Sequence, residues 1–308
     1  MELHGVGKII YYMREKKGLT QMQVCKGICT KTTISRIEKG GREYDSLISE
    51  TLLGRLGGTA SRLEFVLDDQ DYCLYEMRER LLDRIKNDQA QEAKALMKRY
   101  KAQMPPDNRL HQQFLLYCEA LYKKNQNASR EEVCSLLHQA IALTRPDYLD
   151  RTNGMLLYSP IEVHLIYHLF LYENYTEEEL YPVIRFMEEL YDAKTQIHSL
   201  IPFLYEWMKR YEAEEDWQGL KAVCERAVRI INKGRGYDYL ADFCFGKVEA
   251  EEGLLRSESL SEEKRGQLLK ECRNCFYMSM IEEDTGRMEK IQKFCEEKLG
   301  CQIIRQAI

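Results

Sequence analysis

The sequence predicts an all-α protein in which a small basic head precedes a long array of helical hairpins. The chain has 308 residues but only six prolines, so few positions interrupt a helix. From about residue 71 onward, apolar residues recur with the period of about 3.6 that marks one face of a helix. Short breaks rich in Asn, Ser and Glu divide that pattern at intervals that fit pairs of helices.

Charge is distributed unevenly along the chain. Residues 1–60 carry ten Lys and Arg against six Asp and Glu, a net charge of +4, whereas the other residues carry 35 against 44, a net charge of −9. A basic head on an acidic body is expected where the head binds a polyanion and the body binds something else. A solvated surface would produce the same imbalance, so the charges alone do not decide between the two.

The sequence also excludes some classes of protein. No segment approaches the run of roughly 18 apolar residues that a membrane span requires. The first twelve residues contain neither a long apolar core nor the cleavage site of a secretory signal. We therefore expect a cytoplasmic protein without a membrane partner, in which the eleven cysteines remain thiols.

The head is predicted to begin with three short helices, over residues 7–17, 21–27 and 31–39. Gly18 ends the first, and Thr20 and Gln23 form a capping box at the start of the second. Thr30 can cap the third helix, which stops at Gly40. Two short helices joined by a glycine-containing turn form the helix-turn-helix pattern.

The third helix presents small hydroxyls and positive charges on its predicted exposed face: Lys31, Thr32, Thr33, Ser35 and Arg36. Hydroxyl groups reach base edges or phosphates, and arginine can form two hydrogen bonds with guanine, so this face suits the major groove of DNA. A small helical domain whose polar face only holds water would contain the same residues. The pattern by itself leaves both interpretations open.

Three motifs of the head resemble the Xre/Cro-type helix-turn-helix domain: Gly18-Leu-Thr-Gln21, Gly27-Ile-Cys-Thr30 and Ile34-Ser-Arg-Ile-Glu-Lys-Gly40. The second motif, with its place between Gln21 and Glu38, resembles the Rgg/PlcR-type peptide-sensing transcription regulators. Segments 52–57 and 63–67 fit the end of the same domain. Cys25 departs from the pattern, because the family usually has alanine there, but both residues are small enough for the same packing.

The resemblance implies roles for four further residues of the head. Gln21, at the start of the second helix, would donate to a DNA phosphate. Arg14 and Glu38 match an internal ion pair of the family and are interpreted as structural. Arg42, which follows the Gly-Gly turn, would contact the DNA backbone.

The acidic body is predicted to form hairpins over 107–124 with 130–144, 160–173 with 176–193, 197–212 with 216–232, and 238–256 with 261–281. The spacing along the sequence from one hairpin to the next exceeds the roughly 34 residues of a tetratricopeptide repeat. We therefore expect divergent tetratricopeptide-like repeats stacked in a right-handed solenoid, and residues 155–256 resemble the repeats of the same regulators. The predicted domains are a helix-turn-helix domain over 1–68, a linker helix over 69–88 and a repeat domain over 89–308.

A stacked array of hairpins leaves a concave face that is lined by the first helix of each pair. Several side chains on those helices fall outside the apolar stripe and are predicted to bind a peptide: Tyr117, His164, Tyr167, His168, Phe203, Trp207 and Arg210. Rings would accept apolar side chains, and polar tips would bind the peptide backbone. The alternative is that these rings pack against the neighbouring hairpin.

The sequence shows no motif of a common enzyme class. It contains no Walker loop, no dinucleotide-binding glycine motif and no nucleophile elbow. His164 and His168 share one helix face but have no evident third ligand for zinc. We therefore predict no catalytic residue, no cofactor and no metal.

Together these features predict a sequence-specific transcription regulator whose repeat domain senses a short signalling peptide, as in quorum sensing. The resemblance implies a homodimer bound to double-stranded DNA at a two-fold operator. In a first alternative, the repeat domain is only a dimerisation or protein-docking scaffold without a peptide ligand. In a second, the body is an enzyme, but no nucleophile, base or metal set can be assembled for it.

Overall fold

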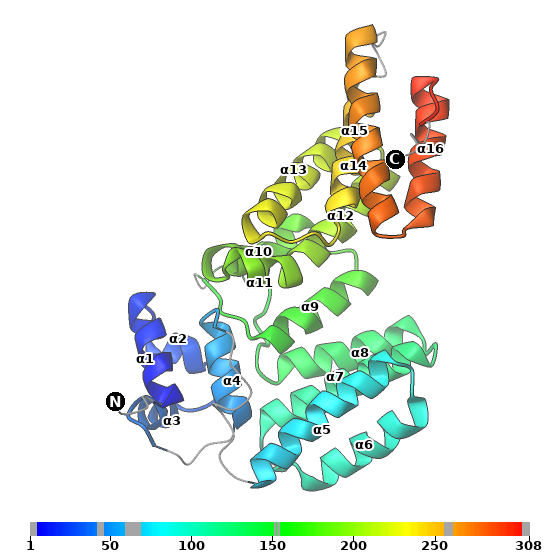
Figure 1. Cartoon of the computed structure of the whole chain (residues 1–308). Coiled ribbons are helices and arrows are strands. Elements are labelled where there is room, and N and C mark those ends of the chain that lie inside the picture. The colour runs from blue at the N-terminus through cyan, green and yellow to red at the C-terminus, as the bar shows by residue number, and fades with distance from the viewer. Residues whose placement is uncertain are drawn as a thin grey trace. The chain divides into compact units, whose positions relative to one another are not determined.

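The structure is a computed structural model that describes residues 5–41, 46–58, 69–150, 152, 155–255 and 261–303. These residues form sixteen helices, α1 to α16, and no strand, so the all-α prediction is confirmed (Figure 1). The chain divides into two compact units, residues 1–190 and 191–308.

The first unit begins with the four helices of the head, α1 (Val6–Lys16), α2 (Gln21–Cys25), α3 (Lys31–Glu38) and α4 (Ser46–Arg55). α1 packs against α3 and α4, and α2 packs against the same two helices. Their shared core contains Ile10, Val24, Ile34, Ile37 and Leu52, all fully buried. The three short helices predicted for the head are therefore confirmed to within two residues at each end.

The same unit continues with α5 (Asp69–Lys86), α6 (Ala90–Gln103), α7 (Arg109–Asn125), α8 (Arg130–Ala142), α9 (Pro160–Tyr172) and α10 (Glu177–Leu190). α5 pairs with α6, and both pack against α7 around a core that includes Leu81, Ala93, Tyr100 and Cys118. α7 pairs with α8, as predicted, and α8 packs against α9. The helix expected as a linker over 69–88 is thus the first member of a hairpin.

The head and the first hairpins belong to one compact unit because α4 packs against both α7 and α9. The compact units therefore do not follow the predicted division at residues 68 and 88. That division into folding domains stays a prediction, since contacts within the folded chain do not test which segments fold alone.

The second unit contains α11 (Ala193–Ser199), α12 (Ile201–Ala213), α13 (Trp217–Gly234), α14 (Leu240–Leu255), α15 (Glu262–Ile281) and α16 (Thr285–Leu299). Each helix from α12 to α15 packs against the next one along the chain. The helix predicted over 197–212 is split at Leu200, because Pro202 lies in the first turn of α12 and has no backbone N–H to continue α11. α16 was not predicted, although Met288, Ile291 and Cys295 have helical spacing.

Candidate DNA-binding face and ligand cavity

The helix-turn-helix is held by the two threonine caps that its sequence predicts. The Thr20 hydroxyl accepts from the backbone N–H of Gln23 at 3.3 Å, and Oε1 of Gln23 accepts from the backbone N–H of Thr20 at 2.8 Å. The Thr30 hydroxyl accepts from the backbone N–H of Thr33 at 3.1 Å. Gly27, in the turn between α2 and α3, has a φ of 77°, which favours glycine.

The outer face of α3 carries the side chains that were predicted to read DNA. Lys31, Thr32 and Arg36 are exposed, and Thr33 and Ser35 are half-buried. The two isoleucines of α3 are fully buried on the opposite face. α3 therefore presents two positive charges and the Thr32 hydroxyl to solvent while its apolar face anchors it in the head, and the hydroxyl of Thr33 is hydrogen-bonded to that of Thr30 at 2.9 Å. Whether these five residues contact DNA stays a prediction.

The Arg14–Glu38 ion pair is present and largely buried. Nε of Arg14 donates to Oε1 of Glu38 at 2.6 Å, and Nη2 donates to Oε2 at 3.0 Å. Nε2 of Gln21 donates to the same Oε2 at 2.8 Å. Gln21 was predicted to bind a phosphate, and one of its two amide N–H groups is used inside the head instead. The other can still donate to a phosphate. Arg42 lies outside the described residues.

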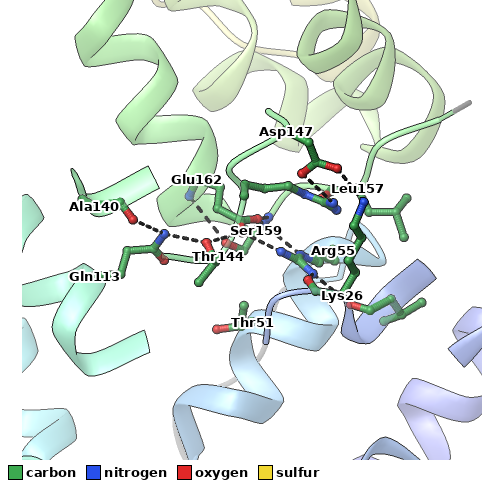
Figure 2. A network of polar contacts seen from close by, with 12 residues as sticks. Lys26, Thr51, Arg55, Gln113, Ala140, Thr144, Asp147, Leu157, Ser159 and Glu162 are labelled. Carbon is green, nitrogen blue, oxygen red and sulfur yellow. Dashed lines mark hydrogen bonds and ion pairs between the residues drawn. The ribbon is translucent and has the colours of Figure 1, made fainter. Parts of the chain in front are cut away.

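A buried polar network joins the head to the helices that follow it (Figure 2). Nη2 of Arg55, at the end of α4, donates to Oε1 of Glu162 at 2.6 Å, and Nε donates to Oε2 at 3.3 Å. Nη1 of Arg55 donates to the carbonyl oxygens of Val24 and Lys26. The Thr144 hydroxyl donates to Oε1 of Glu162 at 2.6 Å. Both Arg55 and Glu162 are 0% exposed, so their charges are satisfied entirely within the protein.

The pairing of Arg55 with Glu162 was not predicted, although one signal in the sequence points to it. Glu162 is the only Asp or Glu in α9, a helix that is mostly apolar apart from two histidines, and it forms a capping box with Ser159. Burial raises the pKa of Glu162, but the charge and hydrogen bond of Arg55 outweigh it, so the pKa is lowered and the carboxylate stays ionised. A lone carboxylate in an apolar helix indicates a buried cationic partner elsewhere in the chain.

Two glycines allow the head to pack closely against the segments around Thr144 and Pro160. A Cβ atom at Gly27 would lie 1.9 Å from the carbonyl oxygen of Thr144, and one at Gly54 would lie 2.3 Å from Cδ of Pro160. At the edge of the contact, Nζ of Lys26 forms an ion pair with Oδ2 of Asp147 at 2.6 Å. The head is therefore held by a buried ion pair, backbone contact at glycines and an exposed ion pair.

Four of the residues predicted to bind a peptide lie together in the first unit. The ring of Tyr117 is 6.5 Å from that of His164 and 5.8 Å from that of His168, and the rings of Tyr167 and His168 are 5.7 Å apart. Burial lowers the pKa of His168 to about 3, so this ring is neutral near pH 7. Its Nδ1 is buried without a hydrogen-bond partner.

A cavity of about 220 Å³ lies between α4, α5, α7 and α9, next to this aromatic group. Its apolar wall is formed by Leu47, Leu82, Leu110, Phe114, Pro160 and Ile161. Its polar lining includes Glu50, Arg78, Glu79, Gln113, Tyr117 and His164. The predicted residues Tyr117 and His164 thus border an apolar cavity with a few polar groups, which is the usual character of a small-molecule site.

The expectation that Phe203 and Trp207 lie outside the core is wrong. They are 0% and 3% exposed, and their ring centroids are 6.5 Å apart. The reason is that α12 packs against α11, α13 and α14, so side chains on more than one of its faces are buried. Arg210 is half-buried, and burial lowers its pKa.

Within the described residues, no group of three or more His, Cys, Asp or Glu side chains is placed to hold a metal ion. The same part of the chain contains no helix that is both long and apolar enough to cross a membrane.

Comparisons with known proteins return solved structures only. No protein-family model and no curated protein matches the chain. The apo form of the competence regulator ComR from Streptococcus vestibularis is 17% identical, with 95% of this chain and 97% of that chain covered and a TM-score of 0.44. ComR from S. thermophilus, in complex with DNA and its signalling peptide ComS, is 18% identical over 96% of this chain and 100% of that chain, with a TM-score of 0.44.

PlcR from Bacillus thuringiensis, in complex with the peptide PapR7 and DNA, is 15% identical over 93% of this chain and 98% of that chain, with a TM-score of 0.46. PlcR is one of the regulators that the motifs of the head resemble.

Proposed function

We propose that the protein is a transcription regulator that inserts α3 into the major groove of double-stranded DNA. The observation that carries this proposal is the arrangement of α3, whose apolar face is buried in the head while Lys31, Thr32 and Arg36 are exposed on the other. Lysine and arginine bind phosphates in a salt-dependent manner, and arginine can read guanine. Such a protein acts in the cytoplasm and catalyses no reaction.

We further propose a homodimer, because a two-fold operator presents two equal half-sites about one helical turn apart to two copies of α3. For the body we propose that it senses a short signalling peptide, the kind of partner named for ComR and PlcR. The group formed by Tyr117, His164, Tyr167 and His168 supports this, since the four rings lie together and Tyr117 and His164 border a cavity. The burial of Phe203 and Trp207 favours this location over α12.

The DNA proposal is tested by selecting bound sequences from a random double-stranded library and measuring affinity for the selected site by gel shift. Arg36→Ala should weaken binding by about 1–3 kcal/mol and relax the preference at one base pair. Arg265→Ala, at an exposed position on α15, is the matched control and should leave both unchanged. Unchanged affinity and preference in both Arg36→Ala and Lys31→Ala would show that α3 does not enter the groove.

A further inference from the structure

Two buried polar groups in the lining of the cavity have no hydrogen-bond partner. Arg78 of α5 is 4% exposed, and its Nη2 lies 3.3 Å from Oε2 of Glu50, but its Nη1 is unpartnered. Gln113 of α7 is 0% exposed, and its Oε1 is unpartnered. Buried polar atoms are nearly always hydrogen-bonded in folded proteins, so a donor and an acceptor left unpaired in one cavity indicate a missing partner.

The orientation of the Gln113 amide is set by its neighbours. Its Nε2 donates to the carbonyl oxygen of Ala140 at 3.0 Å and to the Thr144 hydroxyl at 2.6 Å. The Thr144 hydroxyl donates in turn to Glu162, so it accepts from Gln113 (Figure 2). Exchanging the oxygen and nitrogen of the amide would break both bonds. Oε1 is therefore an acceptor that only a donor outside this network can satisfy.

The cavity is large and apolar enough for more than water. Cavities of about 150 Å³ with aliphatic and aromatic walls bind molecules of the size of benzene, and this one measures about 220 Å³. Most of the surface that lines it is apolar, and leucine, phenylalanine, proline and isoleucine side chains contribute to it. An apolar side chain of a ligand would be accommodated there, while water would leave most of that wall without favourable contacts.

The charges of the lining restrict the ligand further. One guanidinium, that of Arg78, faces the cavity together with the carboxylates of Glu50 and Glu79. A simple anion would be attracted by Arg78 and repelled by both carboxylates. A ligand that carries an N–H donor beside its carboxylate matches the unpaired donor of Arg78 and the unpaired acceptor of Gln113 at once.

We propose that this cavity binds an apolar amino-acid unit with a free carboxylate. The carboxylate accepts from Nη1 of Arg78, the α-nitrogen donates to Oε1 of Gln113, and the side chain lies against the apolar wall. This chemistry is shared by a free apolar amino acid and by the C-terminal residue of a peptide. The site deepens the proposed sensing function and rests on it for its biological role, but the binding itself requires no DNA.

The position of the site connects the ligand to the DNA-binding head. Leu47 and Thr51 of α4 line the cavity. In addition, Gln113, Thr144, Glu162 and Arg55 form one continuous chain of hydrogen bonds from the cavity to the end of α4 (Figure 2). A ligand that bonds to Gln113 therefore adds a partner at one end of the network that holds the head.

The test is calorimetric titration of the full-length protein without DNA, using three probes. N-acetyl-leucine has the carboxylate and the amide N–H of a peptide's C-terminal residue, free leucine has an ammonium group instead, and leucinamide lacks the carboxylate. Saturable binding of either of the first two, with leucinamide at least tenfold weaker, supports the site. The tighter of the two identifies the source as a peptide terminus or a free amino acid. Absence of binding by both, or equal binding of leucinamide, overturns the proposal.

Two variants place the binding in this cavity. Arg78→Lys keeps a positive charge beside Glu50 but loses the Nη1 donor, and should weaken binding of the better probe about tenfold or more. Arg80→Lys, on the exposed side of the same helix, is its matched control and should bind as wild type. Ile161→Phe fills the cavity without changing a charge and should abolish binding. Unchanged affinity in Ile161→Phe would place the ligand elsewhere. If the wild-type protein binds DNA but none of the probes, the proposal for this site is overturned and the proposal for DNA binding is not.

Discussion

Arg55 and Glu162 lie 107 positions apart in the sequence and form a fully buried ion pair, with Nη2 and Oε1 at 2.6 Å. Arg55 belongs to the head, and Glu162 belongs to α9. Since Arg55 also donates to the carbonyl oxygens of Val24 in α2 and of Lys26 directly after it, one side chain connects α4, the end of α2 and α9. The position of the head on the helices that follow it therefore depends on an ion pair in which each buried charge requires the other.

Removing one member of this pair should destabilise the protein strongly. Arg55→Met removes the ion-pair partner of the buried Glu162 carboxylate and leaves it only the charge of Arg145, with which no ion pair is formed; this should lower the free energy of unfolding by about 3–5 kcal/mol in urea denaturation. Arg55→Met combined with Glu162→Leu removes both charges and should recover part of that loss. Lys26→Ala removes an ion pair whose lysine is 54% exposed and should change stability by about 1 kcal/mol or less. An equal effect of Arg55→Met and Lys26→Ala would mean that the buried pair does not hold the head.

Gly27→Ala should detach the turn after α2 from the turn after α8. The added Cβ would lie 1.9 Å from the carbonyl oxygen of Thr144, which is a backbone atom and cannot move aside as the end of a flexible side chain could. Gly18→Ala is the matched control, because Gly18 also has a positive φ, of 64°, but has nothing within 4 Å. The control should show only the strain of a left-handed alanine, about 1–2 kcal/mol. Gly27→Ala should lower the free energy of unfolding by more than the control does, and it should speed hydrogen exchange of the amides around Thr144. Equal effects of the two variants would contradict close docking at Gly27.

Gln21→Ala separates two roles of one side chain. Loss of the hydrogen bond to Glu38 should lower the free energy of unfolding by about 1 kcal/mol. If the second amide N–H also donates to a phosphate, affinity should fall equally for all DNA sequences in a gel-shift series. Glu38→Ala removes the buried counter-charge of Arg14 and leaves only its ion pair with the exposed Glu15, so it should cost up to about 3–5 kcal/mol in the same denaturation measurement. A Gln21→Ala protein with normal DNA affinity would restrict Gln21 to its structural role.

Local signals in the sequence predicted local structure well. The caps at Thr20 and Thr30 need only residues three positions away, so the helix-turn-helix could be located from the sequence. The pair of Arg55 with Glu162 joins distant segments, and no periodicity shows which charges meet. Phe203 and Trp207 were misjudged for the same reason, because a helix covered by several neighbours buries more than one face. The cavity at Arg78 and Gln113 could be located only in the packed structure, since side chains of four helices line it.

The half-buried ring of His168, whose Nδ1 is fully covered, should make the protein less stable in mild acid. Burial, assisted by the charges of Lys124 and His164, lowers the pKa of His168 to about 3, whereas a histidine in the unfolded chain has a pKa of about 6.5. Between these two pKa values the unfolded state binds more protons than the folded state. The free energy of unfolding therefore rises with pH and falls on acidification. From pH 7 to pH 5 this residue should account for a loss of about 1–2 kcal/mol.

His168→Gln keeps a polar side chain of similar size but cannot take up a proton. In urea denaturation at a series of pH values, the variant should lose less stability than wild type between pH 7 and pH 5. Above about pH 7.5 neither state of wild type protonates this ring, so the two curves should run parallel there, which serves as the internal control. Equal slopes of wild type and His168→Gln between pH 5 and pH 7 would show that the ring is accessible to protons in the folded protein. The group of Tyr117, Tyr167 and His168 would then be open to solvent rather than packed as described.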